Sequence, residues 1–366
     1  MIAAAGVAFA VLLMCTQVGF YFALLDSTVE LLQRCNAELF IKSTNRYSLV
    51  NREGFSIRRL RQAAACEGVT DTYPLYLEPT LAVWRNLDDG LPRWIRVIGF
   101  NPMDPVLLIP EVWDLRDRLL PAGAAISDRQ SKAIYGPIGE GVESELTGKR
   151  VKIVGQFDLA TDFMNDGNLI MSARNFQRYF PMRGGSASTL DDVDLGLIKI
   201  AAGQEPRDIR QRLQAALPRD VDVLTKAEMI GEERRFWQRS TPVGIVFGMG
   251  TVMGFIVGVI ICYQVLFSQL ADFMPEFATL KAMGYPFRYF LGVVIQQALL
   301  LAILGFIPGL LLSALLYQGI GAWTGLLMRL TVGRSLVVLL LTVLMCVASG
   351  FLAIRKVRSA DPAELF

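Results

Sequence analysis

The stretch TPVGIVFGMGTVMGFIVGVIICYQVLFSQL, residues 241–270, runs for 30 residues without a charged side chain. A helix that crosses the hydrocarbon core of a bilayer needs about 20 apolar residues. Three further tracts of the 366-residue chain are equally free of charge, at residues 1–25, 289–328 and 335–354. The sequence therefore predicts a polytopic α-helical membrane protein with one large polar insert between the first and second tracts.

The composition excludes several classes of enzyme and binding protein. The chain has no histidine, which rules out Ser-His-Asp and Cys-His nucleophiles and histidine-ligated metals. The balance of 36 Lys+Arg against 34 Asp+Glu, a net charge of +2, gives no signature of nucleic-acid binding. We expect no metal, no cofactor and no catalytic residue in this chain.

The flanking charges predict how the tracts cross the membrane. No basic residue precedes the first tract, and it is longer than the apolar core of a signal peptide, which favours an uncleaved helix. The third tract is too long for one span, but two spans there would place Arg355, Lys356 and Arg358 outside, against the positive-inside rule. We therefore interpret it as one helix kinked near Pro308, followed by a connection. Both termini are then cytoplasmic and the large domain is extracytoplasmic.

The expected organisation follows from these boundaries. It comprises helix 1 (1–25), a polar domain (26–239), helix 2 (241–267), a cytoplasmic loop (268–288), helix 3 (289–318), a short outer connection (319–334), helix 4 (335–354) and a cytoplasmic tail (355–366).

The polar domain has the mixed patterns of an α/β fold. Runs rich in β-branched and alternating apolar residues predict strands within 37–50, 69–84, 94–100, 151–157 and 193–200. Helical patterns lie at 56–66, 111–120, 173–179 and 206–217, and the last has an apolar face of Ile209, Leu213 and Leu217. Residues 226–239 are typical of a charged helix that leads into helix 2 as a stalk.

Other features of the sequence have simple interpretations. Asp191, Asp192 and Asp194 indicate a solvated turn, with a calcium site as the alternative. Trp84, Trp94 and Trp113 are expected in the core, and Trp237 and Trp323 in an aromatic belt at the membrane boundary. Whether Cys35 and Cys66 form a disulfide stays open.

Small and polar residues mark helix 2 as a packing helix. Gly250, Gly254 and Gly258 form a ridge that permits close helix contact, either within the chain or across a dimer seam. Gln264 lies at membrane depth, where it either hydrogen-bonds across such a seam or sits near an interface.

The loop after helix 2 carries the signals of a short capped helix. Pro275 suits a first turn, Glu276 complements the dipole there, and Gly284 is a natural terminating residue. Phe277, Leu280 and Met283 share one face. An amphipathic helix lying on the inner leaflet is one interpretation of this pattern.

Several motifs resemble one superfamily of transporter subunits. Residues 276–285, EFATLKAMGY, resemble the loop after the second helix in FtsX/MacB-type ABC transporter permeases. Further segments resemble its cyanobacterial DevC-type branch, along essentially the whole chain: 68–76, 166–168, 194–198, 216–221, 240–244, 253–258, 263–264, 304–309 and 355–366. Members of that superfamily carry a cytoplasmic amphipathic segment before their first helix, whereas this sequence begins inside the apolar tract.

This resemblance implies a four-helix MacB/FtsX-type fold with a MacB-like periplasmic core domain, working as a homodimer in the inner membrane. It implies a separate ABC ATPase, because the chain has no G-x-x-x-x-G-K-[ST] motif. The coupling helix that docks in a groove of this ATPase would comprise Glu276, Phe277, Ala278, Thr279, Leu280, Lys281, Met283 and Gly284.

The resemblance also implies what the ATP-driven motion would accomplish. ATP-driven motion would pass to the outer domain, which engages a periplasmic adaptor (a membrane fusion protein) and, through it, a TolC-like outer-membrane channel. The cargo would be glycolipid-like or otherwise amphipathic. The alternative is an FtsX-like regulator, in which the same motion switches on a cell-wall hydrolase and nothing is transported.

Overall fold

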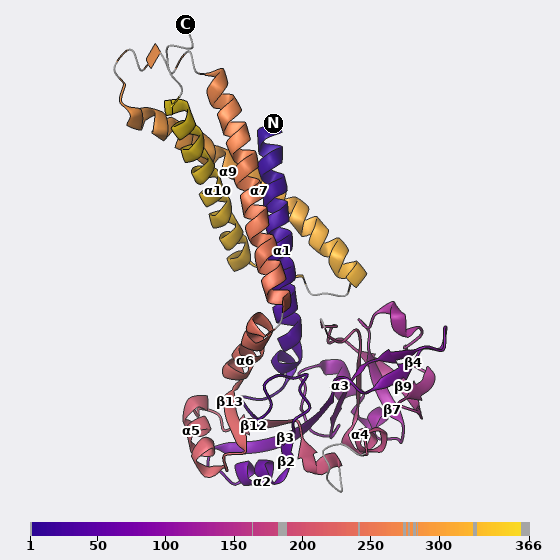
Figure 1. The fold of residues 1–366 in the computed structure, drawn as a ribbon. Helices are drawn as coiled ribbons and strands as arrows, with labels where there is room; N and C mark the ends of the chain where they lie inside the picture. Colours follow the sequence, from indigo (N-terminus) through magenta and orange to yellow (C-terminus); the bar gives the residue numbers. More distant parts are fainter. Residues whose placement is uncertain are drawn as a thin grey trace. The chain divides into compact units, whose positions relative to one another are not determined.

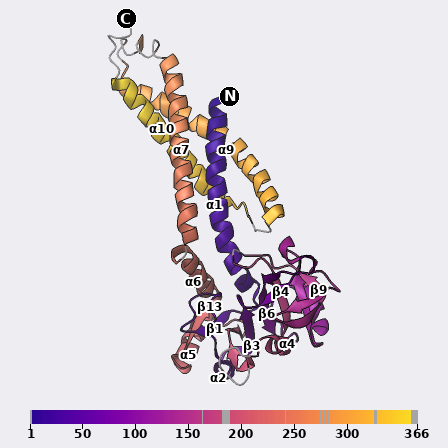
Figure 2. The same ribbon diagram turned by 45° about the vertical axis from the view of Figure 1, so that its right-hand side comes forward.

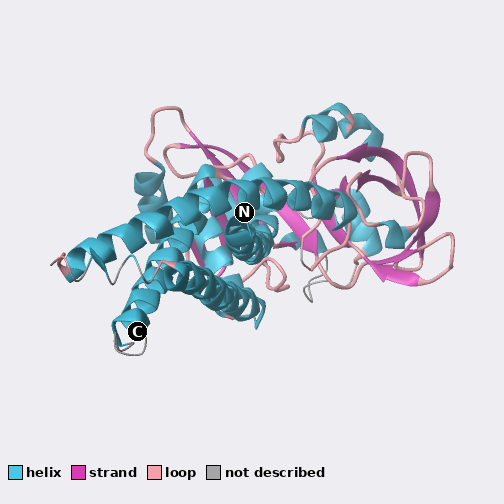
Figure 3. Ribbon diagram, turned by 90° about the horizontal axis from the view of Figure 1, so that it is seen from above, coloured by secondary structure: helices cyan, strands magenta, loops and turns pink. Residues whose placement is uncertain are grey.

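The computed structural model describes residues 2–162, 164–181, 189–240, 242–273, 276, 279–280, 283, 285–324 and 328–359. The chain forms two compact units. One, the membrane unit, comprises Met1–Ala23, Pro242–Trp323 and Met328–Phe366, and the other, the α/β unit, comprises Leu24–Thr241 with Thr324–Leu327. The strands of the described residues all belong to the α/β unit (Figure 3).

The membrane unit is built from long apolar helices. These are α1 (Ile2–Arg34, of which the part up to residue 23 belongs here), α7 (Pro242–Asp272), α9 (Phe287–Thr324) and α10 (Val332–Ser359). Within the described residues, four helices are long and apolar enough to cross a membrane: Ala4–Arg34, Gly244–Asp272, Arg288–Gly321 and Val332–Arg355. The predicted fold class, four such helices with a mixed α/β domain between the first two, is confirmed.

All four helices are longer than their sequence-based ranges, and α1 and α9 show why. α1 continues beyond residue 25 to Arg34, because the hydroxyls of Ser27 and Thr28 donate to carbonyls of the preceding turn rather than ending the helix. α9 continues beyond residue 318 with Pro308 inside it. Membrane helices tolerate an internal proline where neighbouring helices pack against it.

Glycines and other small residues let α1 pack between α7 and α9 (Figure 2). A Cβ added at Gly258 of α7 would meet Ala10 Cβ of α1 at 3.0 Å, and one added at Gly305 of α9 would meet Val7 Cβ at 2.5 Å. The Tyr317 hydroxyl of α9 donates to the backbone carbonyl of Cys15. Close backbone approach over small residues is the usual basis of helix association in lipid, where burial of apolar surface supplies little.

The α/β unit contains an eleven-stranded mixed sheet among its described residues, in the order β13-β1-β12-β3-β6-β10-β7-β9-β8-β4-β5. Figure 1 shows the α/β unit and labels several of these strands. Neighbours pair antiparallel except β6 with β10 and β7 with β9, which are parallel. The strands are β1 (Leu39–Ser43), β3 (Val69–Glu78), β4 (Val83–Arg85), β5 (Pro92–Trp94), β6 (Arg96–Phe100), β7 (Ala124–Asp128), β8 (Glu143–Leu146), β9 (Lys149–Phe157), β10 (Asn168–Ser172), β12 (Leu195–Ile200) and β13 (Val221–Thr225). β2 (Phe55–Ser56) and β11 (Asp192–Val193) form a separate pair.

Both faces of this sheet are covered, so its central strands are apolar on both sides. Along β1, Leu39 and Ile41 point into one core and Phe40 into the other, as the two-residue period of a strand requires. The first core is closed by α2 (Arg58–Ala64), α4 (Ala173–Tyr179) and α5 (Pro206–Ala216). The second is closed by the end of α1, by α3 (Pro110–Asp114) with the 3-10 turns η1 (Arg116–Leu119), and by α6 (Lys226–Arg239). Two further 3-10 turns are η2 (Ala133–Tyr135) and η4 (Thr189–Asp191).

The structure corrects several sequence-based interpretations of single residues. Trp84 is buried as expected, but Trp94 is 75% exposed and Trp113 is also exposed, because they lie on an edge strand and on the outer side of α3. Trp237 is buried in the α/β unit rather than placed in an aromatic belt, because it points from α6 into a polar cluster. The side chain of Trp323 lies outside the described residues.

The structure also answers the questions of the Cys35–Cys66 disulfide and of the acidic run at 191–194. Cys35 and Cys66 are both free thiols and belong to opposite cores of the sheet, so they form no disulfide. Asp194 is 1% exposed and therefore not part of a solvated turn, because it serves as the buried partner of Arg46. No group of three or more Cys, Asp or Glu in the described part of the chain is placed to hold a metal ion.

Candidate functional site

The loop after α7 is only partly within the described residues. Glu276, Thr279 and Leu280 are helical, and Leu280 packs against the small apolar cluster formed by Leu270, Phe290, Val294 and Ile354. The Met283 amide donates to Thr279 O at 3.1 Å and the Tyr285 amide to Leu280 O at 3.2 Å. A hydrogen bond spanning five residues is typical of a helix C-terminus. Phe277, Ala278, Lys281 and Gly284 of the predicted coupling helix lie outside the described residues.

The glycine ridge on α7 faces α1 of the same chain. Added Cβ atoms at Gly250, Gly254 and Gly258 would contact side chains of Gln17, Met14 and Ala10 respectively. These partners recur at helical spacing along one face of α1, and the two helices run antiparallel. Gln264 is exposed in the single chain.

In the α/β unit, the end of α1 is tied to α6. The Lys226 ammonium, in the first turn of α6, donates to the Gln33 and Cys35 carbonyls at 2.9 and 2.7 Å, which satisfies carbonyls at the C-terminus of α1. Arg234 of α6 pairs with Asp26 of α1 at 2.8 Å. α6 itself begins with a capping box, in which Thr225 and Glu228 exchange hydrogen bonds. The two segments that lead along the chain to the first and second candidate spans therefore meet here.

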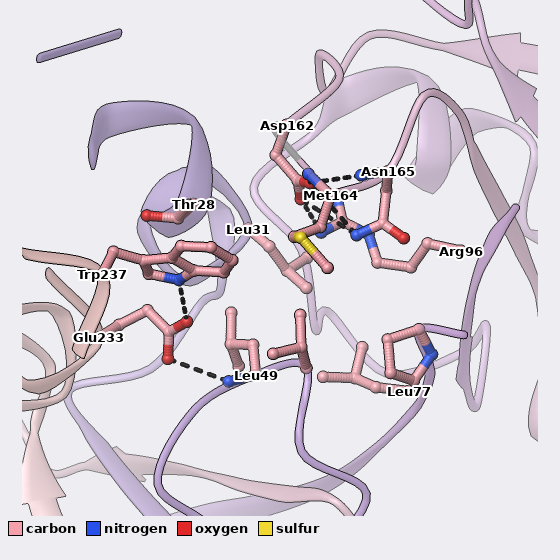
Figure 4. Close-up of a pocket in the computed structure, with 12 residues that line it drawn as sticks. Thr28, Leu31, Leu49, Leu77, Arg96, Asp162, Met164, Asn165, Glu233 and Trp237 are labelled. Atoms are coloured by element: carbon pink, nitrogen blue, oxygen red, sulfur yellow. Dashed lines mark hydrogen bonds and ion pairs between the residues drawn. The ribbon is translucent and has the colours of Figure 1, made fainter. Parts of the chain in front are cut away.

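A buried carboxylate connects α6 to the β1–β2 loop, residues 44–54. Glu233 is 2% exposed and accepts three hydrogen bonds, from Ser48 Oγ at 2.8 Å, from the Leu49 amide at 3.0 Å and from Trp237 Nε1 at 2.8 Å. We call this arrangement the Glu233 latch. Figure 4 shows the carboxylate between the indole and the Leu49 amide.

The same loop is anchored to the sheet by a buried ion pair. The Arg46 guanidinium pairs with Asp194, at the start of β12, and also donates to Glu53 O at 2.7 Å. The second oxygen of Asp194 accepts the Leu77 amide of β3 at 2.7 Å. The loop thus has one anchor on α6 and one on the centre of the sheet.

A shallow pocket lies beside the latch (Figure 4). Apolar side chains of α1, the β1–β2 loop and β3 line it, and its far wall carries Arg96 paired with Asp162. Asp162 also accepts the Asn165 amide at 2.7 Å, and Arg96 donates to Asn168 at 2.7 Å. These groups satisfy one another, so the far wall is polar and internally bonded.

Burial sets the electrostatics of the cluster. It raises the pKa of Glu233, against the opposing effects of the three donors and of the Arg46 charge. Desolvation likewise lowers the pKa of Lys226 and raises that of Asp128, which lies near Arg96. For Glu233 the direction means that the folded α/β unit favours the protonated acid more than an open loop would.

A second surface feature is an exposed apolar patch at the end of the sheet. It comprises large side chains of the β4–β5 hairpin, its flanks and η2: Leu81, Leu87, Leu91, Trp94 and Ile134. The elements are held together by hydrogen bonds from Trp84 Nε1 to Tyr135 O and from Tyr135 OH to Trp94 O. Exposed clusters of this kind mark interaction surfaces more often than single exposed residues do.

Sequence reasoning missed the latch and its anchors. Arg46 and Asp194 are far apart in the sequence, and Asp194 was interpreted as part of a solvated turn. Glu233 had a usable signal, because Met229, Glu233 and Trp237 recur every four residues and form the buried face of α6. A carboxylate between two apolar residues on such a face indicates a buried, hydrogen-bonded group.

Comparison with known proteins finds a family model and solved structures that are similar to parts of the chain. Residues 244–362 match the family model of the FtsX-like permease C-terminal domain. Among solved structures, the periplasmic region of MacB from Actinobacillus actinomycetemcomitans is similar at 10% identity and a TM-score of 0.36, over 57% of this chain and 95% of that one. The extracellular domain of the noncanonic ABC-type transporter YknZ from Gram-positive bacteria is similar at 11% identity and a TM-score of 0.34, over 52% and 99%. No curated protein matches the sequence.

The protein is a multi-pass membrane protein whose second, third and fourth candidate spans lie in the matched segment. The matched segment, about a third of the chain, is similar to the C-terminal domain of FtsX-like permeases.

Proposed function

We propose that this chain is the permease subunit of an ABC exporter that passes ATP-driven motion to its α/β unit. A separate ATPase hydrolyses ATP, and the loop at 268–288, with Glu276 in its helix, docks on that ATPase. The α/β unit lies outside the membrane and both chain termini lie in the cytoplasm. Two copies of the chain form the working assembly in the inner membrane.

The observation that carries this proposal is the double attachment of α6. This helix is tied to the end of α1 by Lys226 and Arg234 and to the sheet through the β1–β2 loop. α1 and the segment after α6 continue along the chain into candidate membrane spans. A helix pair bonded to each other and to the sheet can transmit a displacement, because packed elements shift as rigid pieces.

The exporter would work as part of a tripartite system. We infer a periplasmic adaptor on the α/β unit, an outer-membrane TolC-like channel engaged through it, and a glycolipid-like or other amphipathic cargo, as in DevC-type permeases. The exposed patch around Trp94 supports a protein partner, since an uncovered tryptophan on an edge strand is costly without one.

Co-purification from native membranes tests the partners. The full chain is captured and the proteins that accompany it are identified by mass spectrometry. An ABC ATPase together with an adaptor is the expected result. An ATPase with a cell-wall hydrolase or its regulator, and no adaptor, would favour the FtsX-like alternative. Absence of any ATPase would contradict the proposal.

Charge reversal at the loop tests the docking site. Glu276→Lys places a positive charge at the N-terminal end of the loop helix, where a negative one is favourable, and should uncouple ATP hydrolysis from export. Asp114→Lys, an exposed reversal in the α/β unit, is the matched control. Unchanged export by Glu276→Lys would exclude this loop as the coupling element.

A further inference from the structure

The Glu233 latch holds a titratable group at a place where its charge has no ion-pair partner. Within the described residues, no lysine or arginine forms a salt bridge with Glu233, and its three partners are neutral donors. Nearby buried acids differ, because Asp194 is paired with Arg46 and Asp162 with Arg96. A buried carboxylate held by neutral donors alone changes its contacts most when it binds a proton.

We propose that the Glu233 latch is a proton-sensitive joint, which holds the β1–β2 loop on α6 more firmly in acid and releases it more readily as the pH rises. This inference rests on the proposed function only for its consequence, which is that the stiffness of the α6-to-sheet connection follows the pH outside the membrane.

The geometry accommodates both protonation states. The ionised carboxylate accepts from Ser48, Leu49 and Trp237. After protonation the acid needs one acceptor for its own O–H, and the Ser48 hydroxyl, which is 2.8 Å away, can turn to supply it. The Leu49 amide and the indole can continue to donate to the acid. Protonation therefore removes a buried charge and keeps the hydrogen bonds from Leu49 and Trp237, while the Ser48 hydroxyl changes from donor to acceptor.

The sign follows from burial. Desolvation raises the pKa of Glu233 above that of the same carboxyl when the loop is open and hydrated. The latched state then binds the proton more tightly than the open state does. The extra stability of the latched state is complete below the ordinary pKa of a glutamate, and it is lost as the pH rises through the raised pKa of Glu233.

The surrounding charges do not reverse this sign. From the loop, Arg46 favours the ionised form, but its guanidinium is bonded to Asp194 and to the Glu53 carbonyl. On α6 and β1, Glu232 is paired with Lys42 at 2.8 Å. Across the pocket, Arg96 pairs with Asp162, and α1 lines the pocket with the uncharged Thr28 and Leu31. Asp26 of α1 pairs with Arg234 of α6. Burial remains the largest effect on Glu233.

Amide hydrogen exchange at Leu49 tests the proposal directly, since this amide donates to the carboxylate. The full chain in lipid nanodiscs is compared at a series of pH values, from mildly acidic to mildly alkaline, with each rate divided by the intrinsic rate at that pH. No ATPase is needed, so failure here is distinguishable from failure of the proposed function. We expect the protection of Leu49 to fall as the pH rises.

Two variants and one control complete the test. Glu233→Gln should abolish the pH dependence, and Glu232→Gln, which alters the half-buried neighbour paired with Lys42, should retain it. Ser48→Ala removes a donor that lowers the pKa of Glu233, and it should therefore shift the loss of protection to higher pH. A shift to lower pH would contradict the proposed role of Ser48. A pH-independent wild type, or a Glu233→Gln variant with unchanged pH dependence, would overturn the latch proposal.

Discussion

In the membrane unit α1 packs between α7 and α9 over glycines and accepts a hydrogen bond from Tyr317, whereas in the α/β unit its last turns are held by charged side chains of α6. The first kind of contact depends on shape and the second on charge and hydrogen bonding. α1 is therefore held by different kinds of contact in its two parts. Substitutions that add volume should therefore disturb α1 in the membrane unit, and substitutions that remove charge should disturb it in the α/β unit.

The largest expected effect is loss of the buried anchor between the β1–β2 loop and the sheet. Arg46→Met leaves Asp194 charged and buried, which should cost about 3–5 kcal/mol. The urea unfolding midpoint of the detergent-solubilised chain, followed by tryptophan fluorescence, measures this loss.

A second substitution separates the buried charge from the lost packing. Adding Asp194→Asn to Arg46→Met removes the unpaired charge and keeps an acceptor for the Leu77 amide, so part of the stability should return. If the double variant is no more stable than the single one, the anchor acts through packing and not through charge.

A medium effect is expected from added volume in the membrane unit. Gly258→Leu drives a side chain into Met345 and Ala10, and overpacking of this kind typically costs about 1–3 kcal/mol. The fraction of chain that stays monodisperse on heating in detergent reports the change.

Gly248→Leu is the matched control on the same helix, because nothing in the chain lies within 4 Å of a Cβ added there. Equal losses of monodisperse chain in both variants would mean that a helix from another copy packs over Gly248, and would favour a dimer seam on α7.

The smallest effect is expected from the half-exposed pair between α6 and α1. Arg234→Gln removes the ion pair with Asp26, in which the arginine is 38% exposed, and such pairs contribute about 0.2–1 kcal/mol. The same urea assay checks this value. A loss as large as that of Arg46→Met would show that the α1–α6 contact, rather than the loop anchor, holds the unit together.

Patterns that repeat locally were predictable from the sequence. The charge-free tracts predicted the four long helices, and periodicity predicted α4, α5 and α6 to within a residue or two of their ends. The sequence predicts these helices because one face of each is apolar at helical spacing, or because no charge interrupts them.

What the sequence did not predict depends on contacts between distant residues. β7, β10 and β13 were missed, since short strands that are almost wholly buried have no alternation to reveal them. The burial of Asp194 follows only once the sheet brings it beside Arg46. The exposure of Trp94 follows from the position of β5 at the sheet edge, which no local pattern encodes.

The most direct test of the account is hydrogen exchange of the full chain in complex with its ATPase, with and without a non-hydrolysable ATP analogue. The account predicts that nucleotide changes the protection of α6 and of the β1–β2 loop, as well as that of the loop at 268–288. A change confined to residues 268–288, with the α/β unit unaltered, would contradict the claim that this chain transmits motion from the ATPase to its α/β unit.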